Sequence, residues 1–202
     1  EKDNFTPYTH YKIIEPQKEP IDTVMLSTAK GISKNIFQNL GFLDSKYKRQ
    51  IESFELSEGE IDETDLYSIG FGNTHIFEEI DEIEQYSLDF GILLDESGSM
   101  RGRIREAKLA VLSLLLALKE NRHINLFVYG HTANERDEHE IEIYKYYNSI
   151  ERYVDWTNIF AADSRANNAD GFAIAKVGEI MKKSKSKNRI LIVVSDGQPA
   201  AT

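Results

Sequence analysis

Hydrophobic and polar positions follow a clearer rhythm in the second part of the chain than in the first. From Ser87 onward, short apolar runs typical of buried strands alternate with longer stretches of helical periodicity. Strands are predicted at residues 88–94, 124–129, 141–147 and 190–194, and helices at about 104–120 and 170–183. This alternation favours an α/β fold with a doubly wound, mostly parallel sheet, because each crossover helix returns the chain to the same end of the sheet.

Residues 1–86 are predicted to form an amino-terminal α+β extension, helical with short strands, in front of a domain at 87–202. The predicted elements of the extension are an extended opening segment, a helix over about 22–40 that stops at Gly41, strands at 50–56 and 76–83, and a short helix around Leu66 and Ile69. No evident catalytic cluster lies in this part, so candidate chemistry is sought in the second domain.

Composition narrows the classes of function. The 202-residue chain has a formal net charge of −10, which argues against a nucleic-acid partner and is compatible with binding a cation. It contains no cysteine, which excludes disulfides and thiolate metal sites. The strongest apolar stretch, residues 109–118, is too short to span a membrane. The polar opening does not resemble a signal peptide, so we expect a cytoplasmic protein.

Two of the predicted strands end in an aspartate, Asp95 and Asp196, and parallel strands bring their carboxyl ends to one edge of the sheet. After Asp95, Ser97 and Ser99 can turn their hydroxyls toward one point while Gly98 lets the backbone bend. Hydroxyls, carboxylates and bound water are the ligands that Mg²⁺ prefers. The pattern therefore predicts a site for Mg²⁺ or Mn²⁺ at this edge.

Other interpretations of the same residues exist. Ser97 and Ser99 could simply cap a helix, with Asp95 closing a turn. A phosphatase with an aspartate nucleophile would need a second carboxylate two positions later, where this chain has Ser97. A zinc site is disfavoured because the five histidines form no close pair at ligand spacing, and His131 is expected to be a solvated loop residue. Arg101 and Arg103 are either surface charges or contacts for an incoming acidic group.

The strand–loop–helix context of these residues resembles the metal-ion-dependent adhesion site of von Willebrand factor A (VWA) domains, and beyond that the VWA-bearing subunit of aerobic, ATP-dependent cobaltochelatase. The segments that carry the resemblance are the opening region around Tyr8 and Thr9 and residues 58–62, 94–103, 130–132, 168–171 and 194–199, with the first 86 residues matching more loosely. It implies that Asp170 or Asn168 supplies the middle-loop ligand, where most VWA domains use a threonine. It also implies a Rossmann-like VWA sheet with further strands, so we expect a carboxy-terminal portion of the domain beyond Thr202.

The resemblance implies a binding module and not an enzyme acting on its own. The partner would be a hexameric AAA+ ATPase of the MoxR or cobaltochelatase type, and an acidic residue of a partner protein would complete the coordination of the ion. ATP-driven metal insertion into a tetrapyrrole, as in cobalamin synthesis, is one process it suggests. The alternatives are a cell-surface adhesion VWA domain and a metal-dependent hydrolase, and the second is disfavoured because no general-base pair lies near the loop. No glycine-rich phosphate loop is present, so the chain itself is not expected to hydrolyse ATP.

Overall fold

A computed structural model describes residues 8–46, 51–56, 60–61, 77–81, 88–121, 123–134, 136–137, 139–151 and 155–197. The chain divides into two compact units. One combines Glu1–Asn39 with Ser87–Thr202, and the other is Leu40–Tyr86. The opening segment and most of the first helix therefore belong to the same unit as the predicted second domain.

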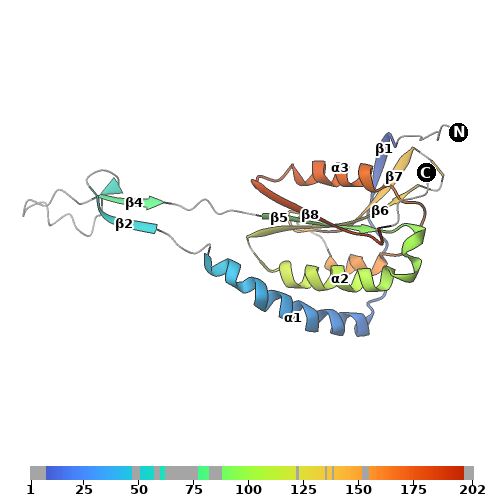
Figure 1. Cartoon of the computed structure of the whole chain (residues 1–202), viewed down its shortest axis with the longest axis horizontal. Coiled ribbons are helices and arrows are strands. Elements are labelled where there is room, and N and C mark those ends of the chain that lie inside the picture. Colours follow the sequence, from blue (N-terminus) through green and yellow to red (C-terminus); the bar gives the residue numbers. More distant parts are fainter. Residues whose placement is uncertain are drawn as a thin grey trace, which may run out of the picture. The chain divides into compact units, whose positions relative to one another are not determined.

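The larger unit is built on a five-stranded sheet with the order β1-β7-β6-β5-β8 (Figure 1). Its strands are β1 (His10–Ile14), β5 (Leu88–Asp95), β6 (Ile124–Ala133), β7 (Glu140–Asn148) and β8 (Asn188–Val194). Strand β5 pairs in parallel with β6 and β8, and β1 pairs in parallel with β7. Strands β6 and β7 are antiparallel, since only a short loop joins them and a parallel pair needs a long crossover. The mostly parallel, Rossmann-like α/β fold is confirmed.

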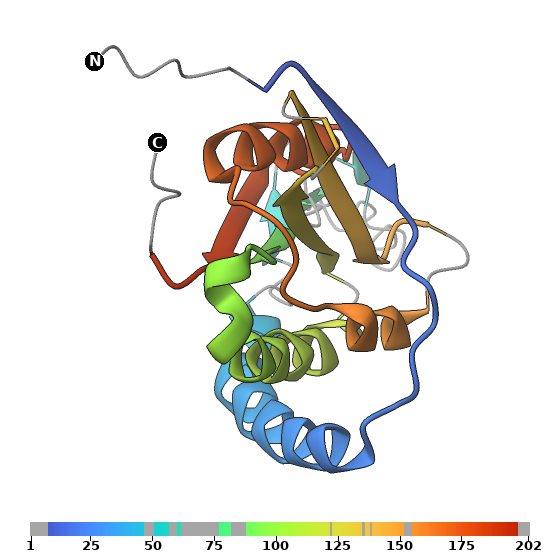
Figure 2. The same ribbon diagram turned by 90° about the vertical axis from the view of Figure 1, so that its right-hand side faces the viewer.

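Helices cover both faces of this sheet (Figures 1 and 2). Helix α3 (Asp170–Met181) lies on one face, and α2 (Ile104–Leu118) lies on the other with α1 (Thr23–Lys46) beside it. Central strand β5 is buried from both sides, as expected for a strand sandwiched between helices. The core between the sheet and α3 includes Leu93, Phe127, Tyr129, Ile143, Ala173, Val177 and Met181. This packing holds the first turn of α3 against the ends of β5 and β6.

Two boundaries differ clearly from the sequence prediction, and one predicted extended segment joins the main sheet. Helix α1 continues through Gly41 to Lys46. A glycine ends a helix only when it takes a left-handed conformation, and Gly41 is instead part of the helix. Strand β6 continues past Gly130 to Ala133, held by β5 on one side and β7 on the other. The extended opening segment forms β1 at the edge of the main sheet. The short helix predicted around Leu66 and Ile69 lies outside the described residues.

The smaller unit contains a three-stranded antiparallel sheet with the order β2-β4-β3. Its strands are β2 (Ile51–Leu56), β3 (Glu60–Ile61) and β4 (Phe77–Asp81). Strands β2 and β4 agree with those predicted at 50–56 and 76–83. Within the described ranges of both units, none of the helices has the length and apolar character needed to cross a membrane.

Candidate metal centre

The carboxyl ends of three parallel strands meet at one edge of the main sheet. Asp95, the last residue of β5, is in register with His131 of β6. On the other side of β5, Leu94 is paired with Val194, so the loop after β8 begins beside Asp95. Helix α3 begins with Asp170 at the same edge. Residues far apart in the sequence are thus placed around the end of β5.

The first loop gathers oxygen atoms through its own backbone. Asp95 is fully buried, and its Oδ1 accepts a hydrogen bond of 2.8 Å from the backbone N–H of Ser97. The hydroxyl oxygens of Ser97 and Ser99 lie 3.0 Å apart. Ser97 is buried and Ser99 is exposed, so the pair connects the interior of the loop to the surface. The loop then enters the 3₁₀ helix η2 (Gly98–Gly102).

The capping interpretation of these serines finds no support in the loop geometry. Ser97 occupies the cap position of η2, but its side chain makes no capping hydrogen bond. Its hydroxyl faces Ser99 instead. The N–H of Gly98 donates to the carbonyl of Ala166 over 2.6 Å, which fastens the loop to the segment before α3. The two hydroxyls are therefore positioned by the loop without being used to start a helix.

The middle loop brings both predicted candidates to the site. The Asn168 amide nitrogen donates to Asp170 Oδ2 over 2.9 Å and lies 3.5 Å from Asp95 Oδ2. Asn168 Oδ1 in turn accepts from the backbone N–H of Asp170 over 2.9 Å. The two residues thus form one hydrogen-bonded unit at the start of α3, in which Asn168 turns its amide nitrogen toward Asp95 and Asp170 has a carboxylate oxygen close to it.

The third loop contacts Asp95 through a residue that the sequence analysis did not select. The Ser195 hydroxyl donates to Asp95 Oδ2 over 2.9 Å. It also accepts a hydrogen bond of 3.2 Å from the N–H of Gly197, which has a positive φ of 72°. The predicted residue Asp196 lies between them and is half-buried. Ser195 could have been noticed because it stands directly after an apolar strand, where a short hydroxyl side chain can reach the neighbouring strand end.

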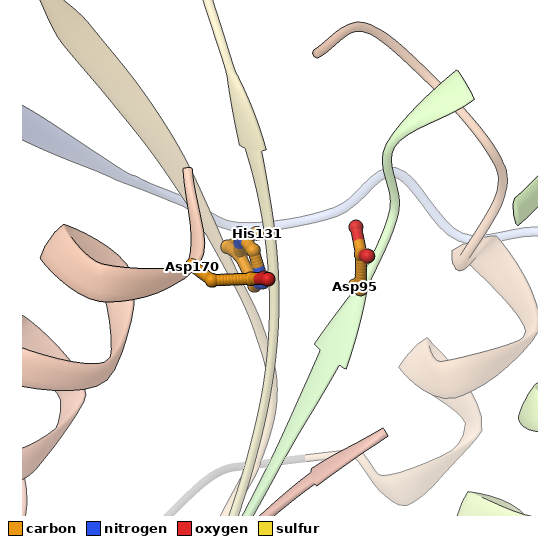
Figure 3. Close-up of side chains that lie close together, drawn as sticks. All are labelled: Asp95, His131 and Asp170. Atoms are coloured by element: carbon orange, nitrogen blue, oxygen red, sulfur yellow. The ribbon is translucent and has the colours of Figure 1, made fainter. Parts of the chain in front are cut away.

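His131 is not the solvated loop residue that was expected. It is fully buried within β6, since this strand runs three residues past Gly130. Side chains alternate along a strand, so His131 shares the α3-facing side with Tyr129 and Ala133. That alternation, read past Gly130, was the signal that could have placed it. Figure 3 shows His131 beside Asp170, with Asp95 on the neighbouring strand.

Asp95, His131 and Asp170 together have the geometry of a cation site. One ligand atom from each lies within 4.8 Å of the other two. His131 Nε2 is 3.2 Å from Asp170 Oδ1, an ion-pair distance, and among the described residues neither ring nitrogen nor this oxygen has any further polar partner. Buried polar atoms with few partners are costly, and a bound ion would satisfy the Asp170 oxygen and one of the two ring nitrogens. The His131 imidazole, followed by the Asn168 amide, also holds the pKa of Asp170 below its usual range. The residues present therefore fit a divalent cation.

A second buried carboxylate supports the loop from the opposite face of the sheet. Glu96 is fully buried and accepts hydrogen bonds from the Tyr146 hydroxyl and, over 2.8 Å, from Arg165 Nε. Burial raises the pKa of Glu96, and the bonds from Tyr146 and Arg165 oppose that rise. The backbone N–H of Arg165 also donates to the Glu96 carbonyl over 2.6 Å. Glu96 thereby ties the first loop to the segment that leads to α3.

Gly130 leaves the space that this carboxylate occupies. A Cβ atom at position 130 would lie 1.8 Å from Glu96 Oε1 and 2.8 Å from the Tyr146 ring. Since both atoms belong to a fully buried cluster, neither has room to withdraw. A glycine is therefore needed at position 130 so that the Glu96 carboxylate and the Tyr146 ring can lie against the backbone of β6.

Comparison with models of known protein families shows which family has this sequence pattern. Residues 90–198, more than half of the chain, match the family model of the von Willebrand factor type A domain. The match runs from β5 through the loop after β8 and includes all three loops of the site. No curated protein matches the chain. The chain therefore belongs to the VWA family, whose domains generally mediate metal-dependent protein–protein interactions and commonly bind a divalent metal.

Proposed function

We propose that this chain is a cation-dependent interaction module in which a partner's carboxylate completes the coordination of a bound Mg²⁺ or Mn²⁺. The observation that carries the proposal is the convergence of the Ser97 and Ser99 hydroxyls, 3.0 Å apart, beside the buried carboxylate of Asp95. Hydroxyl and carboxylate oxygens suit a hard divalent ion that keeps part of its coordination shell for water or another ligand.

The charges at the site favour an acidic ligand from outside. Three of the candidate ligands are neutral: Ser97, Ser99 and Asn168. The Asp95 carboxylate is already shared with the N–H of Ser97 and the hydroxyl of Ser195. An ion bonded to the neutral hydroxyls of Ser97 and Ser99 retains more positive charge than one held by carboxylates alone, and this favours an incoming carboxylate. Because Ser99 is exposed, the side of the ion next to it faces solvent and is reachable by a partner.

The partner we propose is a AAA+ ATPase of the MoxR or cobaltochelatase type. Support comes from the resemblance of segments 94–103, 168–171 and 194–199 to the VWA-bearing cobaltochelatase subunit. The chain would be a non-catalytic subunit that couples ATP-driven motion to a third component. Metal insertion into a tetrapyrrole is the process that this resemblance suggests.

The test is a calorimetric titration of the whole chain with the MoxR-type ATPase of the same organism, in Mg²⁺ and in EDTA. Ser99→Ala removes one exposed hydroxyl ligand and should weaken binding about tenfold or more, as expected for a lost contact to a charged group of roughly 1.5–3 kcal/mol. EDTA should have the same effect as the substitution, and Ca²⁺ should replace Mg²⁺ poorly, since it prefers more ligands at longer distances.

Ser33→Ala in α1 is the matched control, because it removes a serine hydroxyl whose contact is to a carbonyl within its own helix. It should bind the ATPase as the unmodified chain does. Equal affinities for the unmodified chain and Ser99→Ala, with and without Mg²⁺, would refute the proposed function.

A further inference from the structure

His131 is the buried polar group that the proposed function leaves unused. Its side chain is fully buried on the α3-facing side of β6. In the part of the chain that the structure describes, both ring nitrogens lack a hydrogen-bond partner. Buried imidazoles are ordinarily held by a carbonyl, a carboxylate or a metal, and the group beside this one is the Asp170 carboxylate, whose Oδ1 lies 3.2 Å from Nε2 and is itself without a hydrogen bond in the described residues.

The distance between the imidazole and Asp170 is compatible with coordination of a shared ion as well as with a long hydrogen bond. A charged N–H···O bond is usually about 2.7–2.9 Å long, whereas His131 Nε2 lies 3.2 Å from Asp170 Oδ1. Two ligands bonded to one ion at roughly 2.0–2.2 Å lie roughly 3.0–4.4 Å apart, depending on the angle between them. The 3.2 Å separation falls in that range, and a ligand atom of Asp95 lies within 4.8 Å of the other two, close enough for a small shift of its side chain to bring it to the same ion.

We propose that His131 is a direct nitrogen ligand of the same ion as Asp95 and Asp170, and that the site therefore selects a first-row transition ion over Mg²⁺. The inference rests on the proposed function only in assuming that the ion at this edge is the one a partner recognises. Oxygen-only sites suit Mg²⁺ and Ca²⁺, whereas imidazole suits zinc, copper, iron and nickel. One imidazole among carboxylates and hydroxyls therefore favours first-row transition ions such as Mn²⁺, Co²⁺ and Zn²⁺ over Mg²⁺.

The competing interpretation is a simple ion pair between a protonated His131 and Asp170. In that case the imidazolium would repel the ion, and the metal would depend on oxygen ligands alone. The two interpretations differ in metal preference and in whether a nitrogen is bonded to the metal. Both quantities are measurable without any knowledge of the partner.

The first measurement is calorimetric titration of the full chain with Mg²⁺ and with Co²⁺, for the unmodified chain and for His131→Asn. We expect Co²⁺ to bind the unmodified chain at least about tenfold more tightly than Mg²⁺. His131→Asn should lose most of this preference, with a larger loss for Co²⁺ than for Mg²⁺. His10→Asn is the control, because His10 is exposed and pairs with Asp137 outside the site, and it should keep the preference.

The second measurement needs no substitution and therefore holds even if His131→Asn does not fold. Pulsed electron paramagnetic resonance of Mn²⁺ bound to the unmodified chain, labelled with ¹⁵N-histidine, should detect nitrogen bonded to the metal. Ion binding without nitrogen coupling, and with no preference for Co²⁺ over Mg²⁺, would overturn this inference and leave the proposed function intact. Nitrogen coupling together with ATPase binding that is unaffected by EDTA would support the inference and refute the proposed function.

Discussion

Asp95 and Glu96 are adjacent carboxylates, both fully buried, that face opposite sides of one sheet and differ in how they are satisfied. Glu96 receives hydrogen bonds from Tyr146 and Arg165 and forms a closed polar cluster. Asp95 is bordered by His131 and Asp170, each of which has a buried atom without a hydrogen-bond partner in the described parts of the chain. A closed cluster stabilises the fold, and a cluster with unpaired atoms favours a ligand.

Two consecutive residues therefore have different roles: Glu96 supports the fold, and Asp95 belongs to the candidate metal centre. The Glu96 side holds the first loop and the segment before α3 together through both side-chain and backbone bonds to Arg165. The Asp95 side is then free to place its oxygens for an ion, since the loop does not depend on the ion for its shape. Substitutions on the two sides should therefore affect different properties.

The largest effect is expected from Glu96→Ala. It leaves the Tyr146 hydroxyl and the Arg165 guanidinium without their buried partner, which should cost about 3 kcal/mol of unfolding free energy, the low end for a broken buried pair because Arg165 is partly exposed. Asp95→Ala in EDTA should cost less than half as much. Urea denaturation of both variants provides the measurement, and equal losses would show that the two sides do not differ as described.

The next effect is stabilisation by the ion. At roughly 100 times its dissociation constant, an ion that binds only the folded state should add about 2.7 kcal/mol to the unfolding free energy of the unmodified chain. Asp95→Ala should gain almost nothing, because it lacks the central carboxylate of the site. Thermal unfolding across a Mn²⁺ titration measures this. A rise in melting temperature that is equal in both proteins would place the ion elsewhere.

A somewhat smaller effect is expected from Gly130→Ala, which drives a methyl group into the Glu96 carboxylate at 1.8 Å. Overpacking of this kind should cost about 2 kcal/mol. Gly178→Ala in α3 is the matched control, since nothing lies within 4 Å of its added Cβ. It should instead gain about 0.5–1 kcal/mol from helix propensity. Chemical denaturation distinguishes the two, and similar values for both would remove the argument for close approach at Gly130.

The smallest effect concerns Asp155, a hydrogen-bonded carboxylate that is only half-buried and serves as a reference for the fully buried pair. Hydrogen bonds from the Thr157 hydroxyl, Lys18 and the Thr157 N–H lower the pKa of Asp155 from 3.8 to about 2. A lowered pKa means that the stabilisation is present above pH 3.8 and is lost as the pH falls toward about 2.

Asp155→Ala should therefore cost less than about 1 kcal/mol at neutral pH, given the exposure of this cap residue. The gap between variant and unmodified chain should close over the same acid range. Urea denaturation at several pH values measures it, and a gap that widens in acid would contradict the assignment.

Much of the fold and part of the candidate site could be predicted from local patterns. The strands and helices after Ser87 follow from periodicity, and the loop from Asp95 to Ser99 follows from its position between an apolar strand and a helix. At Gly130 the prediction failed because the neighbouring strands β5 and β7 override the local signal. Gly41 and Gly130 both suggested an end, and in both cases the element continues.

The sequence by itself determined the order of the elements, the strand-end aspartates and the paired serines, because each of these depends on residues only a few positions apart. Only the tertiary structure decided that His131 is buried beside Asp170, and that Glu96 is held by residues 50 and 69 positions away. The physical reason is that strand pairing determines which side chains meet across a sheet. Pairing depends on the register between distant segments, and no short stretch of sequence contains that information.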